Sequence, residues 1–206
     1  RGMTVDVKGC HGLMEEAREK ARSGGGHASC VQHLTEIVQR EKLPATKFLG
    51  YEETTSKVST TFRLFDVGEE HAIVAGKTPF YAEAGGQVGD VGTIRAGSMA
   101  FTVTDTQRVG DVIFHMGKLT SGSMPQGAVD AVFTVDASRR ARIMANHTCT
   151  HVMNHKLRAV LGDHVQQKGS LVDADRTRFD FSHTMALQPE EIEKTEHIVN
   201  ADIAAD

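Results

Sequence analysis

Two histidines, His147 and His151, lie four residues apart in a segment with helical periodicity. Successive residues of an α-helix turn by about 100°, so the two imidazoles share one face and are displaced by one turn. Such a pair can bind one divalent metal ion, usually zinc. The chain has 11 histidines, however, and the spacing also arises by chance. A helix surface that carries two histidines without a metal therefore stays an alternative.

The residues next to this pair in the sequence limit the kinds of metal site that it could form. Thr148 stands where the metalloprotease pattern needs a glutamate as general base, so that pattern is absent. His155 extends the row, but it lies about 12 Å along the helix axis from His147. All three histidines therefore cannot bind one ion. Cys149 is turned by about 200° from His147, and we expect it to be a small buried residue on another face.

A glycine-rich stretch, Thr78–Asp90, precedes the histidines. In Gly85-Gly86-Gln87, the glycines let the backbone come close to another group while the amide side chain points at it. The stretch is no phosphate loop, because the Gly-Lys-Ser/Thr ending is missing. A tight turn between two strands is the alternative interpretation.

A polar stretch follows the histidines, in Gln166–Ser170 and Arg176–His183. Amide, ammonium, guanidinium and hydroxyl groups converge there on a predicted hairpin. The hairpin forms either one wall of a polar pocket facing the metal or an ordinary solvated surface.

Three kinds of periodicity divide the chain. Residues 1 to about 45 are predicted to be helical, with one helix at Asp6–Arg22 and another at about Ser29–Lys42 that Pro44 ends. From Thr46 to Val135 the pattern has period two, which predicts a small antiparallel barrel or sandwich. The strands are expected at Val58–Leu64, His71–Ala75, Met99–Thr104, Asp111–Met116 and Ala128–Val135.

From Asp136 the pattern is helical again. Asp136 or Ser138 can cap a helix that runs to Leu161, and Gly162 ends it. Two strands in a hairpin, Val165–Val172 and Thr177–Phe181, follow. A final helix starts at Pro189, and its inner face is expected to carry Ile192, Thr195 and Val199. The fold class is α+β: a helical lead-in, a small antiparallel β-barrel, then an α/β core.

The composition sets limits on partners. The formal net charge is −4, so contact with nucleic acid must use a local basic patch. Three cysteines without close pairing argue against a disulfide scaffold and for a reducing compartment. No apolar run has membrane-spanning length and no signal-peptide pattern is present. We expect a cytoplasmic protein without membrane or DNA partners.

Three stretches together resemble the editing domain of alanyl-tRNA synthetases, and they occur in the order that the family has. They are Thr78–Asp90, the histidine segment Asn146–His151, and the hairpin segments Val165–Val172 and Arg178–His183. The same domain occurs in free-standing alanyl-tRNA editing proteins, and threonyl-tRNA synthetases have a relative of it, their second additional domain. Asp6–Arg22 is similar to the helix that closes the synthetase's tRNA-recognition region, which favours a synthetase fragment. The resemblance implies a tRNA-recognition end (1–45), a barrel subdomain (46–135) and a zinc-dependent editing core (136–206).

The resemblance also implies a function. The parent would be an alanine–tRNA ligase, whose ATP and magnesium belong to a catalytic domain outside this chain. This region would proofread by hydrolysing Ser-tRNA(Ala) and Gly-tRNA(Ala) at the 3′ acceptor end. Proofreading is needed because a pocket built for a methyl group separates such amino acids by only a few kcal/mol.

In the family, zinc is held by two helix histidines, which match His147 and His151, and by a later Cys-x-x-x-His motif. No cysteine follows Cys149. We therefore expect a C-terminally incomplete core that binds zinc poorly and is weakly active or inactive in deacylation. Thr150 and Gln167 match catalytic positions that line the pocket and read the hydroxyl of serine. The matches to tRNA-binding positions are Gly85, Gly86, Gln87, Lys168 and Arg178.

Two other functions stay open. The first is a free-standing trans-editing deacylase. The second is a non-catalytic tRNA-binding module that kept the fold and lost the chemistry. The presence of His147, His151, Thr150 and Gln167 argues against the second.

Overall fold

A computed structural model describes residues 26–205 of the chain. It divides into two compact units, Arg1–Leu43 and Pro44–Asp206. The helix expected at Asp6–Arg22 lies outside the described residues. Within residues 26–205, no helix is long and apolar enough to cross a membrane.

The described part of the first unit is helix α2, Gly26–Glu41. Leu34 and Ile37 are buried, and Val31 and Val38 are partly buried. These positions recur every three to four residues, so one apolar stripe runs along the helix. The expected helix and its stripe are confirmed.

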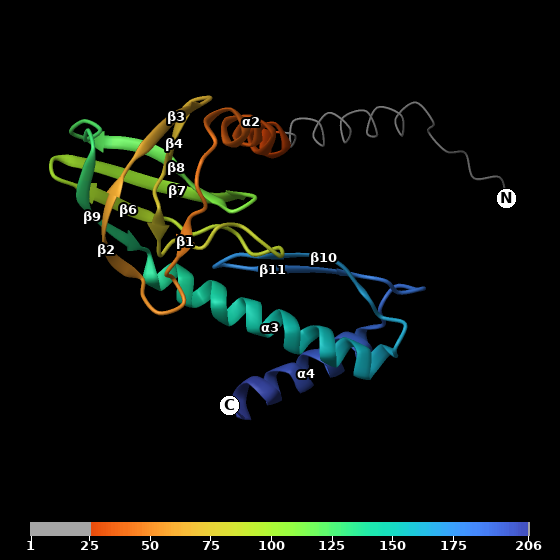
Figure 1. Cartoon of the computed structure of the whole chain (residues 1–206). Coiled ribbons are helices and arrows are strands. Elements are labelled where there is room, and N and C mark those ends of the chain that lie inside the picture. Colours follow the sequence, from red (N-terminus) through yellow and green to blue (C-terminus); the bar gives the residue numbers. More distant parts are fainter. Residues whose placement is uncertain (1–25, 206) are drawn as a thin grey trace. The chain divides into compact units, whose positions relative to one another are not determined.

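The second unit begins with β1 (Lys47–Phe48), which pairs in parallel with β5 (Lys77–Thr78). A larger sheet of seven antiparallel strands follows, in the order β2-β9-β6-β7-β8-β4-β3 (Figure 1). Its strands are β2 (Thr55–Thr61), β3 (Arg63–Val67), β4 (Glu70–Val74), β6 (Gly92–Ala96), β7 (Met99–Val109), β8 (Val112–Ser121) and β9 (Ala128–Val135).

The prediction of a small barrel is wrong, because the sheet does not close within residues 26–205. The two edge strands, β2 and β3, do not pair with each other in the part of the chain that the structure describes, so the sheet is open. The run expected as one strand at Val58–Leu64 is two strands that meet at Phe62 and occupy opposite edges. Strand β6 was not expected, because it is short and starts at a glycine, Gly92. The other expected strands are confirmed, with β7 and β8 longer than predicted.

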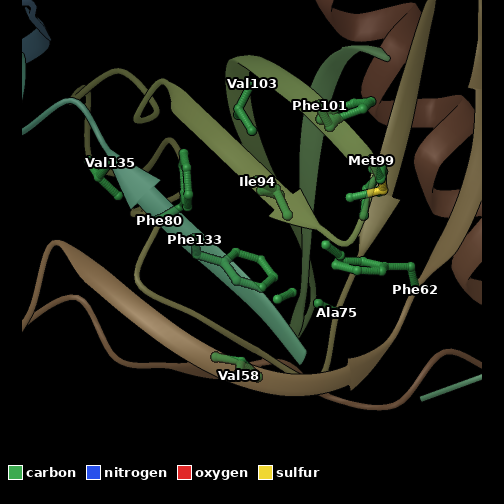
Figure 2. Close-up of a cluster of buried hydrophobic side chains, with 13 residues drawn as sticks. Val58, Phe62, Ala75, Phe80, Ile94, Met99, Phe101, Val103, Phe133 and Val135 are labelled. Atoms are coloured by element: carbon green, nitrogen blue, oxygen red, sulfur yellow. The ribbon is translucent and has the colours of Figure 1, made fainter. Parts of the chain in front are cut away.

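The hydrophobic core lies on one face of this sheet, where the inward side chains of several strands meet (Figure 2). Ile94, Phe101 and Phe133 are fully buried, and the ring of Phe62 stacks on Phe133 at 6.0 Å between centroids. Strand β2 alternates between buried and exposed residues, as the period-two pattern predicts.

Helix α3, Ala137–Leu161, has the predicted ends. The Asp136 carboxylate accepts the backbone N–H of Arg139 at 2.9 Å, and the N–H of Gly162 donates to the carbonyl of Arg158 at 2.9 Å. These contacts satisfy backbone groups that a helix end leaves unpaired.

Beyond α3, the hairpin of β10 (Gln167–Val172) and β11 (Thr177–Phe181) and the helix α4 (Pro189–Ala205) both pack against α3. In α4, Thr195 and Val199 are buried as predicted, but Ile192 is 51% exposed. The prediction for Ile192 is wrong because this side chain lines the margin of an open cavity between α3, β11 and α4.

A histidine, His115 of β8, is fully buried in the sheet. Its Nδ1–H donates to the carbonyl of Ile73 at 2.9 Å, and its Nε2 accepts the hydroxyl of Thr78 at 2.7 Å. Burial lowers the pKa of His115 to about 4, and the hydrogen bond to Ile73 opposes this only in part. His115 is therefore neutral at pH 7, and Thr78, the first residue of the glycine-rich stretch, is fixed to it.

This histidine makes stability depend on pH. The pKa of His115 is about 4 in the folded chain, against an ordinary value of 6.5 in an unfolded one. Its stabilising contribution is complete above pH 6.5 and is lost as the pH falls toward 4, since the unfolded chain then takes up a proton. At pH 5 we expect a loss of about 2 kcal/mol relative to pH 7. Urea unfolding at several pH values should show this slope, and it should be shallower in His115→Gln. Equal slopes would contradict the assignment.

Candidate functional site

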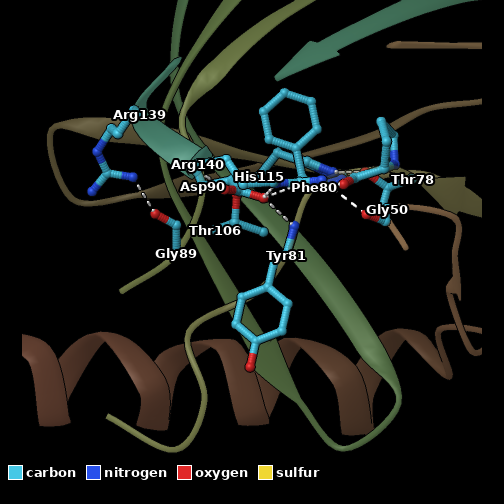
Figure 3. A network of polar contacts seen from close by, with 11 residues as sticks. Gly50, Thr78, Phe80, Tyr81, Gly89, Asp90, Thr106, His115, Arg139 and Arg140 are labelled. Carbon is cyan, nitrogen blue, oxygen red and sulfur yellow. Dashed lines mark hydrogen bonds and ion pairs between the residues drawn. The ribbon is translucent and has the colours of Figure 1, made fainter. Parts of the chain in front are cut away.

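A buried ion pair fixes the first turn of α3 to the sheet loops (Figure 3). Arg140 and Asp90 have side chains only 8% and 3% exposed, and Nε of Arg140 donates to Oδ2 of Asp90 at 3.1 Å. A second nitrogen, Nη2, contacts the same oxygen. The guanidinium also donates to the carbonyls of Gly50, at 3.0 Å, and Pro79. One side chain therefore joins the helix to three separate segments.

Asp90 and its neighbour Gly89 complete this attachment. Asp90 accepts the backbone N–H of Tyr81 at 2.6 Å, and Arg139 donates to the carbonyl of Gly89 at 2.8 Å. The end of the glycine-rich stretch is thus held on α3 by two consecutive arginines.

The amide of Gln87 contacts the first histidine of the pair. Gln87 is buried, and its Oε1 lies 2.6 Å from Nδ1 of His147. An amide oxygen only accepts, so Nδ1 carries the proton and Nε2 keeps its lone pair. Histidines that bind metals are oriented in this way, with one nitrogen donating to a fixed acceptor and the other facing the ion.

His147 and His151 lie side by side on one face of α3, as the spacing predicts. Their ring centroids are 5.1 Å apart and their planes are inclined by 30°. His147 is partly buried and His151 is exposed. Among the described residues, no third histidine, cysteine, aspartate or glutamate joins them in a cluster that could hold a metal. Cys149 is partly buried and lines a different cavity, between α3 and α4.

The two glycines before Gln87 bring the stretch against the hairpin. The N–H of Val172 in β10 donates to the carbonyl of Gly86 at 2.7 Å, and the N–H of Val88 donates to the carbonyl of Val172 at 3.1 Å. Gly86 has φ +83°, and a Cβ there would lie 2.5 Å from the carbonyl oxygen of Ser170. Gln87 therefore sits between α3 and β10 because Gly86 has no side chain.

Adjacent glycines provide a matched test of this close approach. Gly85 has φ +61°, and a Cβ there would have no described atom within 4 Å, so Gly85→Ala meets only backbone strain. We expect that variant to cost about 1 kcal/mol. Gly86→Ala adds a clash with Ser170 and should cost about 2 kcal/mol or more. Urea unfolding of both variants measures the difference, and equal costs would mean that the contact with Ser170 is unimportant.

The two residues predicted to be catalytic do not contact each other through any hydrogen bond found in the described part of the chain. Thr150 is buried, and its hydroxyl donates to the carbonyl of Asn146 one turn earlier, at 2.8 Å. Gln167 is exposed on β10, and its amide donates to the hydroxyl of Ser170 at 3.1 Å. Their catalytic roles stay predictions.

The two basic residues predicted to bind tRNA lie on the exposed surface of the hairpin. Lys168 is exposed on β10. Arg178 is exposed on β11, and its Nε donates to Asp180 of the same strand at 3.2 Å. Lys168 and Arg178 are thus accessible from solvent, and their contacts with RNA stay a prediction.

A cavity of about 310 Å³ opens beside His147. It was not predicted, because its aromatic side chains come from segments far from the histidines in sequence. Arg140 was also missed, since arginines in a row are typical of a solvated helix surface. No signal in the local sequence distinguishes it from Arg142, which is exposed on the same helix. The lining residues are Phe48, Gly50, Tyr51, Tyr81, Gln87, Arg140, Met144 and His147.

The family model that describes tRNA synthetases class II (A) matches residues 1–139, which is more than half of the chain. The match includes the sheet, the glycine-rich stretch and Asp136, the residue that caps α3. Such enzymes ligate amino acids to tRNA for protein biosynthesis, so tRNA is the partner that the family implies. The chain therefore belongs to the class II tRNA synthetases of the alanyl type.

Proposed function

We propose that Pro44–Asp206 is the proofreading part of an alanine–tRNA ligase and hydrolyses Ser-tRNA(Ala) and Gly-tRNA(Ala) at the 3′ acceptor end. The observation that carries this proposal is the contact between Gln87 and His147. It leaves Nε2 of His147 with a lone pair beside the ring of His151. If the two histidines were only part of a solvated helix surface, nothing would require a buried amide to orient one of them.

The same contact supports zinc as the cofactor. His147 and His151 would hold the ion, and their nitrogen donors suit zinc. When bound, zinc supplies a Lewis acid for hydrolysis of an aminoacyl ester. Two ligands are fewer than a zinc site normally has, and no third joins them among residues 26–205. We therefore propose weak zinc binding and weak or absent deacylation by the 206-residue chain itself.

The remaining roles are proposed from the family resemblance and, for the hairpin, from the exposure of its basic side chains. Gln87 holds the imidazole of His147 in one tautomer and orientation before the reaction begins. The ring therefore needs no reorganisation during the reaction. Thr150 and Gln167 are proposed to read the hydroxyl of serine. Lys168 and Arg178, both exposed on the hairpin, are proposed to meet the phosphates of the tRNA 3′ end.

The family match favours one of the proposed origins. It starts at residue 1 and so includes the segment before the sheet. The family resemblance implies that free-standing editing proteins do not normally carry such a segment. This supports a synthetase, acting in the cytoplasm where tRNA is charged, over a trans-editing deacylase. A non-catalytic tRNA-binding module would need neither His151 nor an oriented His147.

The test is the replacement His151→Ala in the whole parent ligase. We expect tRNA(Ala) charged with serine to accumulate several-fold, because the ester is no longer hydrolysed, while charging with alanine is unchanged. The matched control is His155→Ala, which removes an exposed histidine one turn further along the same helix. Unchanged serine mischarging in His151→Ala would overturn the proposed function.

A further inference from the structure

The cavity beside His147 has an aromatic wall made by three rings. Phe48 and Tyr51 meet edge to face with centroids 5.0 Å apart, and Phe48 and Tyr81 do so at 6.0 Å. The edge-to-face arrangement is one that aromatic pairs prefer. Its volume of about 310 Å³ lies at the lower end of the range of small-ligand pockets.

Tyr51 is unusual among the aromatic residues because its side chain is 89% exposed. A large exposed ring at the margin of a cavity offers an open face for stacking. Met144, on the α3 side of the cavity, is also 59% exposed. The apolar surface at this margin is therefore accessible, whereas Phe101, Phe114 and Phe133 of the sheet are fully buried.

The guanidinium and the amide that line the cavity are hydrogen-bonded within the protein itself. Arg140 donates hydrogen bonds to Asp90 and to the carbonyls of Gly50 and Pro79. Gln87 is bonded to His147. Figure 3 shows that the backbone of Tyr81 belongs to this network while its ring points away from it. The cavity thus offers mainly ring faces, and a flat apolar ligand fits it better than an anion does.

Helix α3 connects this cavity to the histidine pair. Arg140, Met144 and His147 line the cavity at a spacing of four and then three residues, and His151 continues the same row. A flat group held between the rings and Met144 would therefore lie next to His147, with its substituents reaching toward His151.

We propose that this aromatic cavity binds the terminal nucleobase of the tRNA 3′ end by stacking, and so places the aminoacyl ester of the same nucleotide at His147 and His151. The proposal rests on the proposed function for the position of the ester, but not for the binding of the base. Stacking on aromatic side chains suits every base, since each has a π-face, and requires no hydrogen-bonded readout. The net charge of −4 is compatible with this, because stacking needs no basic field.

The test exploits the tyrosine content of the chain. Tyr51 and Tyr81 are its two tyrosines and both line the cavity, so a chain with ¹³C-labelled tyrosine rings gives two reporters of this site. The probe is an RNA minihelix with a single-stranded CCA end, compared at one fixed salt concentration with the same RNA lacking the terminal base. We expect both tyrosine signals to shift with the complete RNA, and the abasic RNA to bind about 5- to 150-fold more weakly.

Variants at Tyr51 complete the experiment. Tyr51→Ala should lose a similar factor of affinity for the complete RNA and none for the abasic RNA, and Tyr51→Phe should retain stacking. Met185→Ala, which removes another exposed apolar side chain, is the control outside the cavity. Equal affinity for the two RNAs, or unmoved tyrosine signals in the complex, overturns the proposal. The His151→Ala mischarging result is independent of this outcome, so the two proposals can fail separately.

Discussion

Replacing Arg140 with methionine is expected to lower the free energy of unfolding by about 3–5 kcal/mol, the largest effect of any single change discussed for this chain. The reason is the carboxylate that remains. Asp90 is 3% exposed and would be left as a buried charge without its guanidinium partner. The carbonyls of Gly50 and Pro79 would lose their donor as well.

The neighbouring arginine provides the matched control. Arg139 donates a side-chain hydrogen bond to the carbonyl of Gly89, a neutral acceptor rather than a buried carboxylate. Arg139→Met should cost about 1 kcal/mol. The double variant Arg140→Met with Asp90→Asn should recover part of the loss, because the buried charge is then removed from both partners. Urea unfolding measures all three, and similar losses for Arg139→Met and Arg140→Met would show that the buried pair is not the anchor.

The ends of α3 could be predicted from sequence because their signals are local. Asp136 caps the helix through a residue three positions away, and Gly162 follows its last turn directly. The hairpin and the start of α4 at Pro189 were predictable for the same reason. The shared face of His147 and His151 follows from helix geometry alone.

The interactions that build the site were not predictable, because they join distant segments. Asp90 and Arg140 are 50 residues apart, and Gln87 and His147 are 60 apart. Nothing in the local pattern distinguishes Arg140, which is buried, from Arg142, which is exposed. The closure of the sheet was predicted wrongly for a related reason. Periodicity describes each strand, but the break at Phe62 and the order of the strands depend on packing.

The second large effect concerns the orientation of His147. Gln87→Leu removes the acceptor 2.6 Å from Nδ1. We expect the proton of the neutral imidazole to move to Nε2, since no partner then holds it on Nδ1. Removal of such a supporting hydrogen bond typically lowers metal affinity about 10- to 100-fold. Gln87→Glu keeps an acceptor at this position and should preserve the Nδ1–H tautomer.

Two measurements on the 206-residue chain separate this effect from a general loss of structure. Long-range ¹H–¹⁵N spectra of the imidazoles report which nitrogen of His147 carries the proton without any metal present. Zinc titration by calorimetry then gives the affinity of the unmodified chain, of Gln87→Leu and of Gln87→Glu. If Gln87→Leu leaves both the tautomer and the affinity unchanged, the contact with Gln87 does not orient His147. If the tautomer changes while the affinity does not, Nε2 of His147 is not the metal-binding atom, and zinc must be sought elsewhere on the protein. If both the affinity falls and the tautomer changes, Gln87 of the glycine-rich stretch sets the zinc affinity of the histidine pair by holding the proton on Nδ1 of His147. Neither segment predicts this dependence by itself.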